Sequence, residues 1–396
     1  MRQIARAAAL VLTCAVATAC GGSETRAQTV EPWPEADALF HQDPRWLGSD
    51  GGASVDLGGG RSLWLFGDTF VALDRRHVRE RSCMVRNTVA VMDGRSPETA
   101  TMTFHWRTAP DGLPESFFPA GGRDICFQAD DSWFWPLDGV RVESGGPLVV
   151  FLSRLRPDRE GLGFAGDGWE AVLVENPDDD PEEWRVDSLG GPPNPWGIEL
   201  GNPAVHVEDN WLYAFGTSEP FDVHLARWPV GTVLAGDLGA PEWWTGEERG
   251  FVPEVELDEK PATLFADALA ESVREVDGGF VALQTIGIGN ASLGVRRAPA
   301  VTGPWSEPEV LWQPPEAERA GVSIYGFETH PELDADGALA LLRVERGRIR
   351  RRHRGRVPLL PPLRQRSLRA LATSGVSSAS DSSTTSASAS ASPGGG

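Results

Sequence analysis

The sequence has little basic charge, few cysteines and, beyond its first twenty residues, no long apolar run. It carries 36 basic against 57 acidic residues, for a net charge of −21, and almost all of the basic residues are arginine. Recognition of a nucleic-acid backbone needs a basic surface, so this balance argues against a nucleic-acid partner. No later stretch is apolar enough to span a membrane, and no Cys and His spacing suggests zinc. Helical periodicity is weak, with Pro261–Ala270 as the one short candidate.

Glycine, proline and tryptophan, in contrast, are abundant. The 396 residues include 45 Gly, 31 Pro and 15 Trp. This much glycine and proline is typical of many short strands and turns. The tryptophans indicate packing between sheets, with a few left to stack on a ligand. The length could hold two average domains, but a closed β fold of about 320 residues is common as a single domain.

One hairpin-like pattern recurs along the chain. In its first copy, within Arg45–Phe70, a polar residue precedes a short strand, a glycine turn at 58–60 and an apolar strand. Irregular repeats of one hairpin, about 60 to 90 residues apart, are typical of propeller blades. The sequence therefore predicts an all-β fold, a five-bladed β-propeller over residues 35–345. The other copies begin at Phe134, Gly201, Glu271 and Thr329.

The predicted fifth blade is incomplete, because the composition changes near residue 345. The blade has two convincing strands, from Pro331 and over Leu339–Val344, before a segment, Arg346–Arg369, with ten arginines and no acidic residue. A run of Ser, Thr, Ala and Gly then continues to residue 396. A basic arm with a disordered tail is one interpretation of 346–396. We favour a shifted reading frame, because out-of-frame sequence from a GC-rich genome is rich in Arg, Pro, Ser and Ala; resequencing the locus tests this.

The N-terminus has the pattern of a targeting segment. Arg2 and Arg6 precede an apolar stretch that ends in small residues directly before Cys20. This resembles the lipobox of bacterial lipoproteins, which implies a signal peptide over 1–19, a lipid on Cys20 and a tether over 20–34. The residues after Cys20 resemble those of lipoproteins sorted to the outer membrane. The alternative is an ordinary secretory peptide cut near Ala19. We expect an exported protein that meets the membrane only through its anchor.

Two of the four cysteines remain for the folded domain. Cys14 leaves with the signal and Cys20 takes the lipid, which leaves Cys83 and Cys126. An exported protein folds in an oxidising compartment, and both residues lie just before a strand of neighbouring blades. We therefore expect a disulfide between them; two free buried thiols are the alternative.

Polar residues gather where the predicted strands open onto one mouth of the propeller. In the first blade Asp50 starts the inner strand, Asp68 follows the second strand, and Arg86 and Asn87 precede the third. Capping of turns and strand ends is the competing explanation for each of them, since Asp and Asn commonly do this. Corresponding positions of the other blades hold Asp138, Glu199 or Asn202, Glu271, and Glu328 or His330.

A family resemblance gives these positions roles. The segments WLGSDG, LWLFGDTF, MVRNTVAV, WFWPLDG and GNPAV resemble a family of secreted bacterial five-bladed propellers of unsettled function, over residues 35 to 345. More distantly, the layout is similar to the arabinofuranosidases, xylosidases and related propeller glycosidases. That similarity implies acidic residues at the inner-strand starts of the first three blades and a histidine near a central ion on the fifth. By blade order these are Asp50, Asp138, Glu199 and His330.

Two residues compete with this assignment. Asn202 matches Asp138 in register better than Glu199 does, but an amide cannot replace a catalytic carboxylate. Glu328 competes for the role of general acid, because the blade numbering could be rotated. The candidate catalytic residues are thus Asp50, Asp138, Glu199 and Glu328, with His330 as the metal candidate. The candidate substrate-binding residues are Asp68, Arg86, Asn87, Trp135, Asn202 and Glu271.

The predicted activity is hydrolysis of a glycosidic bond. One carboxylic acid protonates the leaving oxygen while a carboxylate across the sugar activates water or attacks directly, and carboxylates crowded in one funnel keep one of them protonated. Trp133, Trp135 and Trp196 could stack on sugar faces, or pack in the core.

Two other classes compete with a glycosidase. A lectin would use the same funnel to bind glycan, with a calcium ion held in the central channel by the carboxylates. A protein-interaction propeller has only the fold in its favour. Sialidase-type Asp boxes and the WD signature are absent. We expect a monomer with a carbohydrate partner and no nucleic-acid partner; the sequence fixes no cofactor.

Overall fold

β-Strands dominate the structure, which is all-β as the sequence predicts. The computed structural model describes residues 30–121, 124–126, 128–129, 132–160, 163–266, 269–276, 278–287, 291–319, 322–334, 339–346 and 363–370. All of them belong to one unit, Thr29–Ala372. Within them the α-helices are two short ones, α1 (Pro34–Leu39) and α2 (Val230–Leu234), and no helix is long and apolar enough to cross a membrane.

Four large antiparallel sheets follow one another along the chain. The first sheet contains β3 (Ala53–Gly58), β4 (Arg61–Phe66), β7 (Thr88–Asp93) and β8 (Thr101–His105). The second contains β13 (Trp133–Arg141), β14 (Leu148–Pro157), β15 (Phe164–Val174) and β16 (Val186–Gly190). The third contains β17 (Glu199–Glu208), β18 (Trp211–Ser218), β19 (Asp222–Pro229), β20 (Glu242–Trp244) and β21 (Phe251–Pro253). The fourth contains β22 (Leu269–Val276), β23 (Gly279–Ile286), β24 (Ser292–Ala298) and β25 (Glu309–Trp312).

The last large sheet joins the two ends of the described chain. Its strand order is β1-β28-β27-β26, and Val30 pairs with Ala370 while Leu363 pairs with Arg346. The sequence predicted an incomplete last blade, whereas this sheet has four strands. Pairing of strands uses backbone groups, so an arginine-rich composition does not prevent it. The strands are β1 (Val30–Pro32), β26 (Ser323–Thr329), β27 (Leu339–Arg346) and β28 (Leu363–Ala370).

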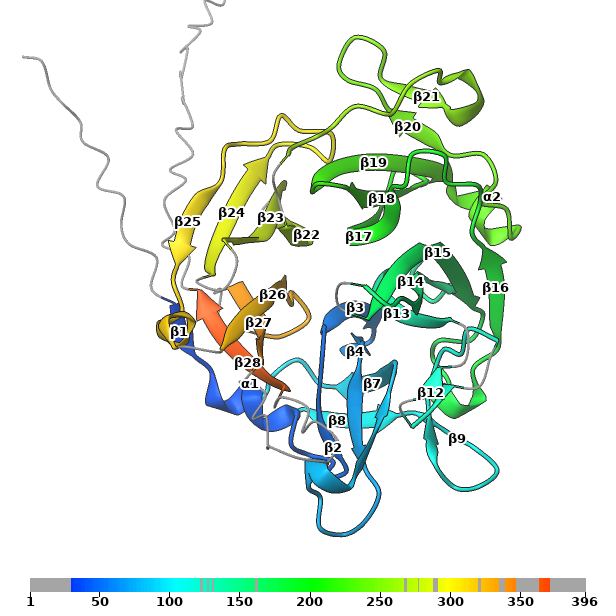
Figure 1. Cartoon of the computed structure of the whole chain (residues 1–396). Coiled ribbons are helices and arrows are strands. Elements are labelled where there is room, and N and C mark those ends of the chain that lie inside the picture. Colours follow the sequence, from blue (N-terminus) through cyan, green and yellow to red (C-terminus); the bar gives the residue numbers. More distant parts are fainter. Residues whose placement is uncertain are drawn as a thin grey trace, which may run out of the picture. The chain divides into compact units, whose positions relative to one another are not determined.

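These five large sheets lie around a common centre (Figure 1). The innermost strand of one sheet contacts the innermost strand of the next, in the order β3, β13, β17, β22 and β26. The core fills the spaces between neighbouring sheets. Leu148–Ser153 of β14 is buried throughout, as expected of a strand that is covered on both faces. Trp64 and Trp228 are fully buried, which confirms that tryptophans pack between sheets.

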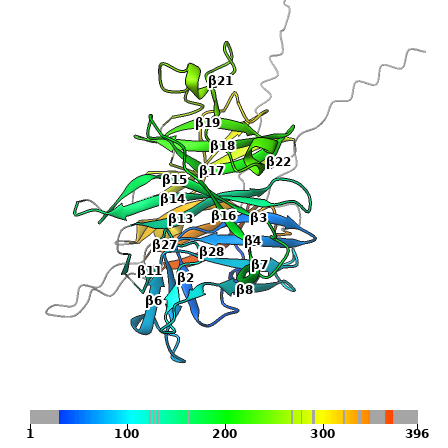
Figure 2. The same ribbon diagram turned by 90° about the vertical axis from the view of Figure 1, so that its right-hand side faces the viewer.

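Two small sheets extend the first large one on one side. They are formed by β2, β5 and β6 and by β9 to β12, and β6 contacts β11; Figure 2 shows β2, β6 and β11 on the same side of the molecule. Their strands are β2 (Trp46–Ser49), β5 (Thr69–Ala72), β6 (Ser82–Val85), β9 (Arg107–Thr108), β10 (Pro114–Glu115), β11 (Asp124–Ile125) and β12 (Gln128–Ala129).

The predicted helix over Pro261–Ala270 is wrong. Described residues 261–266 contain no helix, and the strand β22 begins at Leu269. Single helical turns of the 3₁₀ type occur elsewhere, at Arg79–Arg81, Pro181–Glu183, Glu254–Glu256 and Pro315–Glu318.

Candidate functional site

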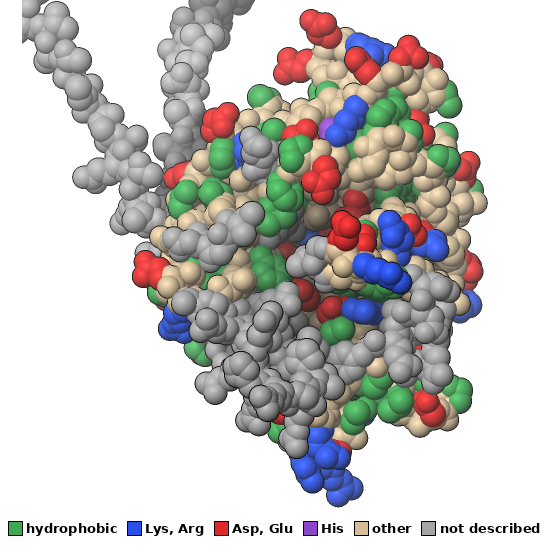
Figure 3. Space-filling model, in the orientation of Figure 1, with side chains coloured by type: hydrophobic (Ala, Val, Ile, Leu, Met, Phe, Trp, Pro, Cys, Tyr) green, Lys and Arg blue, Asp and Glu red, His purple; other side chains and the backbone are tan. Residues whose placement is uncertain are grey.

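A central cavity opens where the inner strands begin. Its volume is about 360 Å³, and Figure 3 shows acidic side chains at the centre of this face. Residues from all five large sheets, and from the loops that lead into them, line it. Five glycines in the lining allow the backbone to approach closely; a Cβ on Gly67 would lie 3.4 Å from the Asp50 carbonyl oxygen. The polar and aromatic lining residues are Asp50, Trp135, Asp138, Asn202, Arg274, Tyr325 and Glu328.

Asp50 follows β2 and is held by donors from two parts of the chain. The Tyr325 hydroxyl donates to Oδ2 at 2.9 Å, and the Gly51 amide donates to Oδ1 at 3.1 Å. The backbone is fixed as well, because the Asp50 carbonyl accepts from the Gly67 amide at 2.7 Å. The carboxylate therefore has a defined orientation at the cavity.

Asp138 lies at a bulge in β13 and is paired with Arg274 of β22. Two nitrogens of the guanidinium donate to its two oxygens at 2.8 and 3.1 Å, and the Val205 amide adds a third hydrogen bond at 3.0 Å. Asp138 is 3% exposed. Burial disfavours the charged form of Arg274, but nearby carboxylates outweigh this, Asp138 foremost, so that the pKa of Arg274 is raised. Sequence reasoning missed Arg274.

Asp68, Arg86 and Trp135 form one side wall. Oδ1 of Asp68 accepts from Trp135 Nε1 at 3.0 Å and from Arg86 Nη1 at 3.3 Å. The Arg86 guanidinium lies 4.1 Å from the centre of the Trp133 ring. The wall brings together three predicted substrate-binding residues, of which Trp135 lines the cavity. Trp133 is buried, and Trp196 packs against Trp243, so both tryptophans serve the core.

Asn87 belongs to the scaffold. Its amide nitrogen donates to the carbonyls of Phe118 and Phe134, both at 2.9 Å, and its oxygen accepts from the Phe118 amide at 2.7 Å. The side chain is 0% exposed. Asn87 is not among the residues that line the cavity. Its side chain satisfies backbone groups, the alternative that the sequence left open, and its substrate-binding role stays a prediction.

The two candidates on β17 have different surroundings. Asn202 lines the cavity and precedes a cis-proline, Pro203. Glu199 lies outside the lining and accepts a hydrogen bond from the Ser153 hydroxyl. Burial raises the pKa of Glu199, and this hydroxyl offsets part of the effect. Glu328 of β26 lines the cavity, whereas the Glu271 side chain lies outside the described residues.

His330 lies in a buried cluster beneath the site. Its Nδ1 is 2.7 Å from the Ser54 hydroxyl, which donates to Glu332 Oε2 at 2.6 Å, and its ring stacks on Trp64. Burial and the charge of Arg274 lower the pKa of His330 well below its usual value. Burial also raises the pKa of Glu332. Glu332 and Arg274 line a second cavity, also of about 360 Å³, toward the other ends of β3 and β13.

The surroundings of His330 do not fit a metal ion. Across the described ranges, no group of three or more His, Cys, Asp or Glu side chains could hold one. The neighbouring Arg274 is itself a cation and lowers the affinity of this place for another. The predicted metal role of His330, and with it a calcium ion there, is therefore not supported by the residues present.

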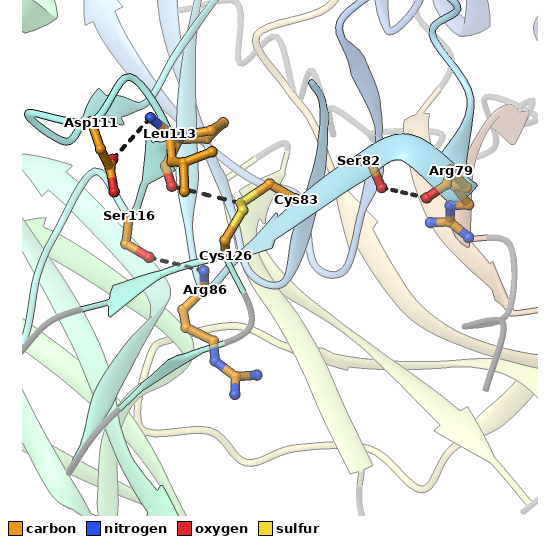
Figure 4. The surroundings of a disulfide bond; sticks show 9 residues. Arg79, Ser82, Cys83, Arg86, Asp111, Leu113, Ser116 and Cys126 are labelled. Atoms are coloured by element: carbon orange, nitrogen blue, oxygen red, sulfur yellow. Dashed lines mark hydrogen bonds between the residues drawn. A yellow bond between two sulfur atoms is a disulfide. The ribbon is translucent and has the colours of Figure 1, made fainter. Parts of the chain in front are cut away.

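A disulfide joins Cys83 and Cys126, as the sequence predicts. Figure 4 shows it between β6 and the segment after β11. Three residues after Cys83, the Arg86 amide donates to the Ser116 hydroxyl at 2.9 Å, so the bridge and this hydrogen bond fix the strand end from which the Arg86 side chain leaves. Cys20 lies outside the described residues.

Comparison with protein families assigns the chain. Residues 35–342 match the model of a domain of unknown function, DUF5005. The chain belongs to this family. The match begins at the first residue of the domain that the sequence predicts and ends within β27. None of the curated proteins compared with the chain matches it.

Solved structures resemble this DUF5005 chain in fold. A candidate hydrolase from Bacteroides ovatus is 16% identical, with a TM-score of 0.64 over 88% of this chain and 92% of that one. An α-L-arabinofuranosidase from Lactobacillus brevis is 12% identical, with a TM-score of 0.46 over 85% and 93% of the two chains. An exo-β-1,3-galactanase from Phanerochaete chrysosporium is 10% identical, with a TM-score of 0.46 over 81% and 60%. Identities this low show likeness of fold alone, and only the first TM-score is high enough to support it.

Proposed function

We propose that this protein is a five-bladed propeller that hydrolyses a glycosidic bond in its central cavity. The proposal is carried by one observation: three carboxylates from distant parts of the chain, Asp50, Asp138 and Glu328, line a single cavity. Asn202 and the indole of Trp135 line it too, and an indole offers a flat apolar face to a sugar ring. Paired carboxylates beside such a face are the groups that glycoside hydrolysis requires.

The three carboxylates take different roles in this mechanism. Asp50, oriented by its two donors, acts as the base that activates water or as the nucleophile. Glu328 protonates the leaving oxygen. Asp138 is engaged by Arg274 on both oxygens, so it serves as a fixed negative charge that stabilises the positive charge developing on the sugar. Glu199 is not required for any step, because it does not line the cavity.

A non-catalytic glycan-binding protein is the second candidate, and the Arg274–Asp138 pair is the observation that favours it. The pair removes one of the three carboxylates from proton transfer. If Glu328 also served only to accept hydrogen bonds from sugar hydroxyls, the cavity would bind without cleaving.

Reducing-sugar release distinguishes these functions. The chain from residue 21 to 396 is incubated with a panel of plant and microbial polysaccharides, beside Asp50→Ala, Glu328→Ala and the surface control Asp187→Ala. We expect turnover in the parent and the control and a loss of at least 100-fold in both cavity variants, because the groups move protons. Circular dichroism verifies folding. Retention on a glycan affinity gel without turnover in the parent overturns the hydrolase in favour of the glycan-binding protein.

We further propose that the protein is exported, anchored by a lipid on Cys20 and monomeric. The Cys83–Cys126 disulfide supports export, since such bonds persist in oxidising compartments. Mass spectrometry of the mature N-terminus tests the anchor: a diacylated Cys20 is expected, and an unmodified residue after Ala19 would contradict it. Light scattering tests the monomer.

A further inference from the structure

The Tyr325 hydroxyl and the Asp50 carboxylate form a contact that joins the two ends of the ring of sheets. Tyr325 belongs to β26 in the last sheet, and Asp50 follows β2 near the start of the fold. Their oxygens lie 2.9 Å apart, although the two residues are 275 positions apart in the sequence. Both line the central cavity.

The Tyr325 ring is held in place by the small sheet of β2, β5 and β6. It packs in a small apolar cluster with Phe70, Leu47 and Met84, which lie on β5, β2 and β6. A tyrosine that is fixed by packing loses little further freedom when its hydroxyl forms a hydrogen bond. The cluster therefore aims the hydroxyl at Asp50.

We propose that Tyr325 is the positioning residue of Asp50. The phenol donates to Oδ2 while the Gly51 amide donates to Oδ1, so the two donors fix the orientation of the carboxylate at the cavity. Two donors also stabilise the ionised carboxylate over the neutral acid. Tyr325 acts through Asp50, touches no reacting atom in this scheme, and has no equivalent at Asp138, whose partner is the cation Arg274.

This role rests on the proposed function only in its catalytic consequence. As a base or nucleophile, Asp50 must be ionised and must point at the substrate. Loss of the phenol would release the carboxylate to rotate and favour its protonation. The consequence is a lower kcat with little change in KM, because sugar binding uses other groups in the cavity.

The contact can be measured without any substrate. The chain has two tyrosines, Tyr213 and Tyr325, so protein grown with 3-fluorotyrosine gives two fluorine NMR signals, which Tyr213→Phe and Tyr325→Phe assign. Between pH 3 and 8 we expect the Tyr325 signal to follow a single titration step, because protonation of Asp50 changes its partner. In Asp50→Asn the step disappears while the Tyr213 signal is unchanged. A Tyr325 signal that titrates equally with and without Asp50 overturns the proposal.

Kinetics test the catalytic consequence separately. With 4-nitrophenyl α-L-arabinofuranoside and β-D-xylopyranoside as probes, Tyr325→Phe is expected to lower kcat at least tenfold, the loss of one hydrogen bond to a charged group, and to move the acid limb of the pH profile upward. An unchanged profile overturns the positioning role. If the parent cleaves neither probe while the fluorine titration behaves as expected, the proposed hydrolase fails and the Tyr325–Asp50 contact stands.

Discussion

Asp50 and Asp138 occupy corresponding places in two successive repeats, yet their surroundings differ. Asp50 accepts from a neutral phenol and a backbone amide. Asp138 is almost fully buried and paired through both oxygens with a guanidinium. One carboxylate is oriented by neutral donors, and the other is buried in an ion pair. The same residue type in the same repeat position therefore has neutral donors as partners in one repeat and a cation in the next.

The largest effect is expected from removing the cation. Arg274→Met leaves Asp138 as a buried carboxylate without its partner, which typically costs about 3–5 kcal/mol of unfolding free energy. Urea denaturation measures it. The matched control is Arg185→Met, whose exposed pair with Glu175 should contribute little to stability, because solvent screens it. The double variant Arg274→Met/Asp138→Leu should recover much of the loss; similar losses in Arg274→Met and the control would contradict the comparison.

A smaller effect separates the two carboxylates directly. Asp138→Asn leaves a buried guanidinium with a neutral partner and should lower the unfolding free energy by about 2–3 kcal/mol, whereas Asp50→Asn loses a bond between a carboxylate and a neutral donor, about 1 kcal/mol. Both variants are measured in the same urea series. Equal losses would mean that Asp50 is as structural as Asp138.

The smallest effect concerns Glu199, a carboxylate that has neither a phenol nor a guanidinium as its partner. Burial raises the pKa of Glu199 in the folded state above its pKa in the unfolded state. At pH values between these two pKa values, the folded state therefore binds more protons than the unfolded state. Stability must then fall as the pH rises above about 4.5. Glu199→Gln should remove this part of the pH dependence, as measured by thermal unfolding between pH 4 and 8. A slope that persists unchanged would show that burial does not disfavour its ionisation.

The sequence predicts those features that local pattern determines. The hairpin repeats identify where inner strands begin, and this is why Asp50, Asp138, Asn202 and Glu328 meet at one cavity. Asp50 precedes β3, whereas Asp138, Asn202 and Glu328 lie within β13, β17 and β26; the repeats therefore locate the polar residues, but not the exact starts of these strands. The sheets are predicted by the same hairpin pattern, and the disulfide is predicted because two cysteines remain for the folded domain.

What the sequence does not reveal depends on contacts between distant parts of the chain. Arg274 lies between Val273 and Glu275, and the local sequence pattern is that of a solvent-facing strand residue. Its place in the buried site depends on the pairing with Asp138, which is 136 residues away in the sequence. Tyr325 carries no local sign of a partner at position 50. Asn87 has the amide side chain of a typical binding residue, but this amide forms its hydrogen bonds with three backbone groups. The helix expected at Pro261–Ala270 was wrong because a weak apolar period is also compatible with the start of a strand.

The pairing of β1 with β28 has a consequence for the order of events during synthesis. Val30 is among the first folded residues to leave the ribosome, and its partner Ala370 emerges only after nearly the whole chain has been made. The earlier sheets can form as they appear, but the last one waits for both ends. Deletion of the arginine-rich segment through residue 370 would thus leave the N-terminal strand without its neighbour and expose the edge of β27 to other chains. The arginine-rich segment, whose composition differs most from the rest of the chain, therefore supplies the strand that completes the last sheet.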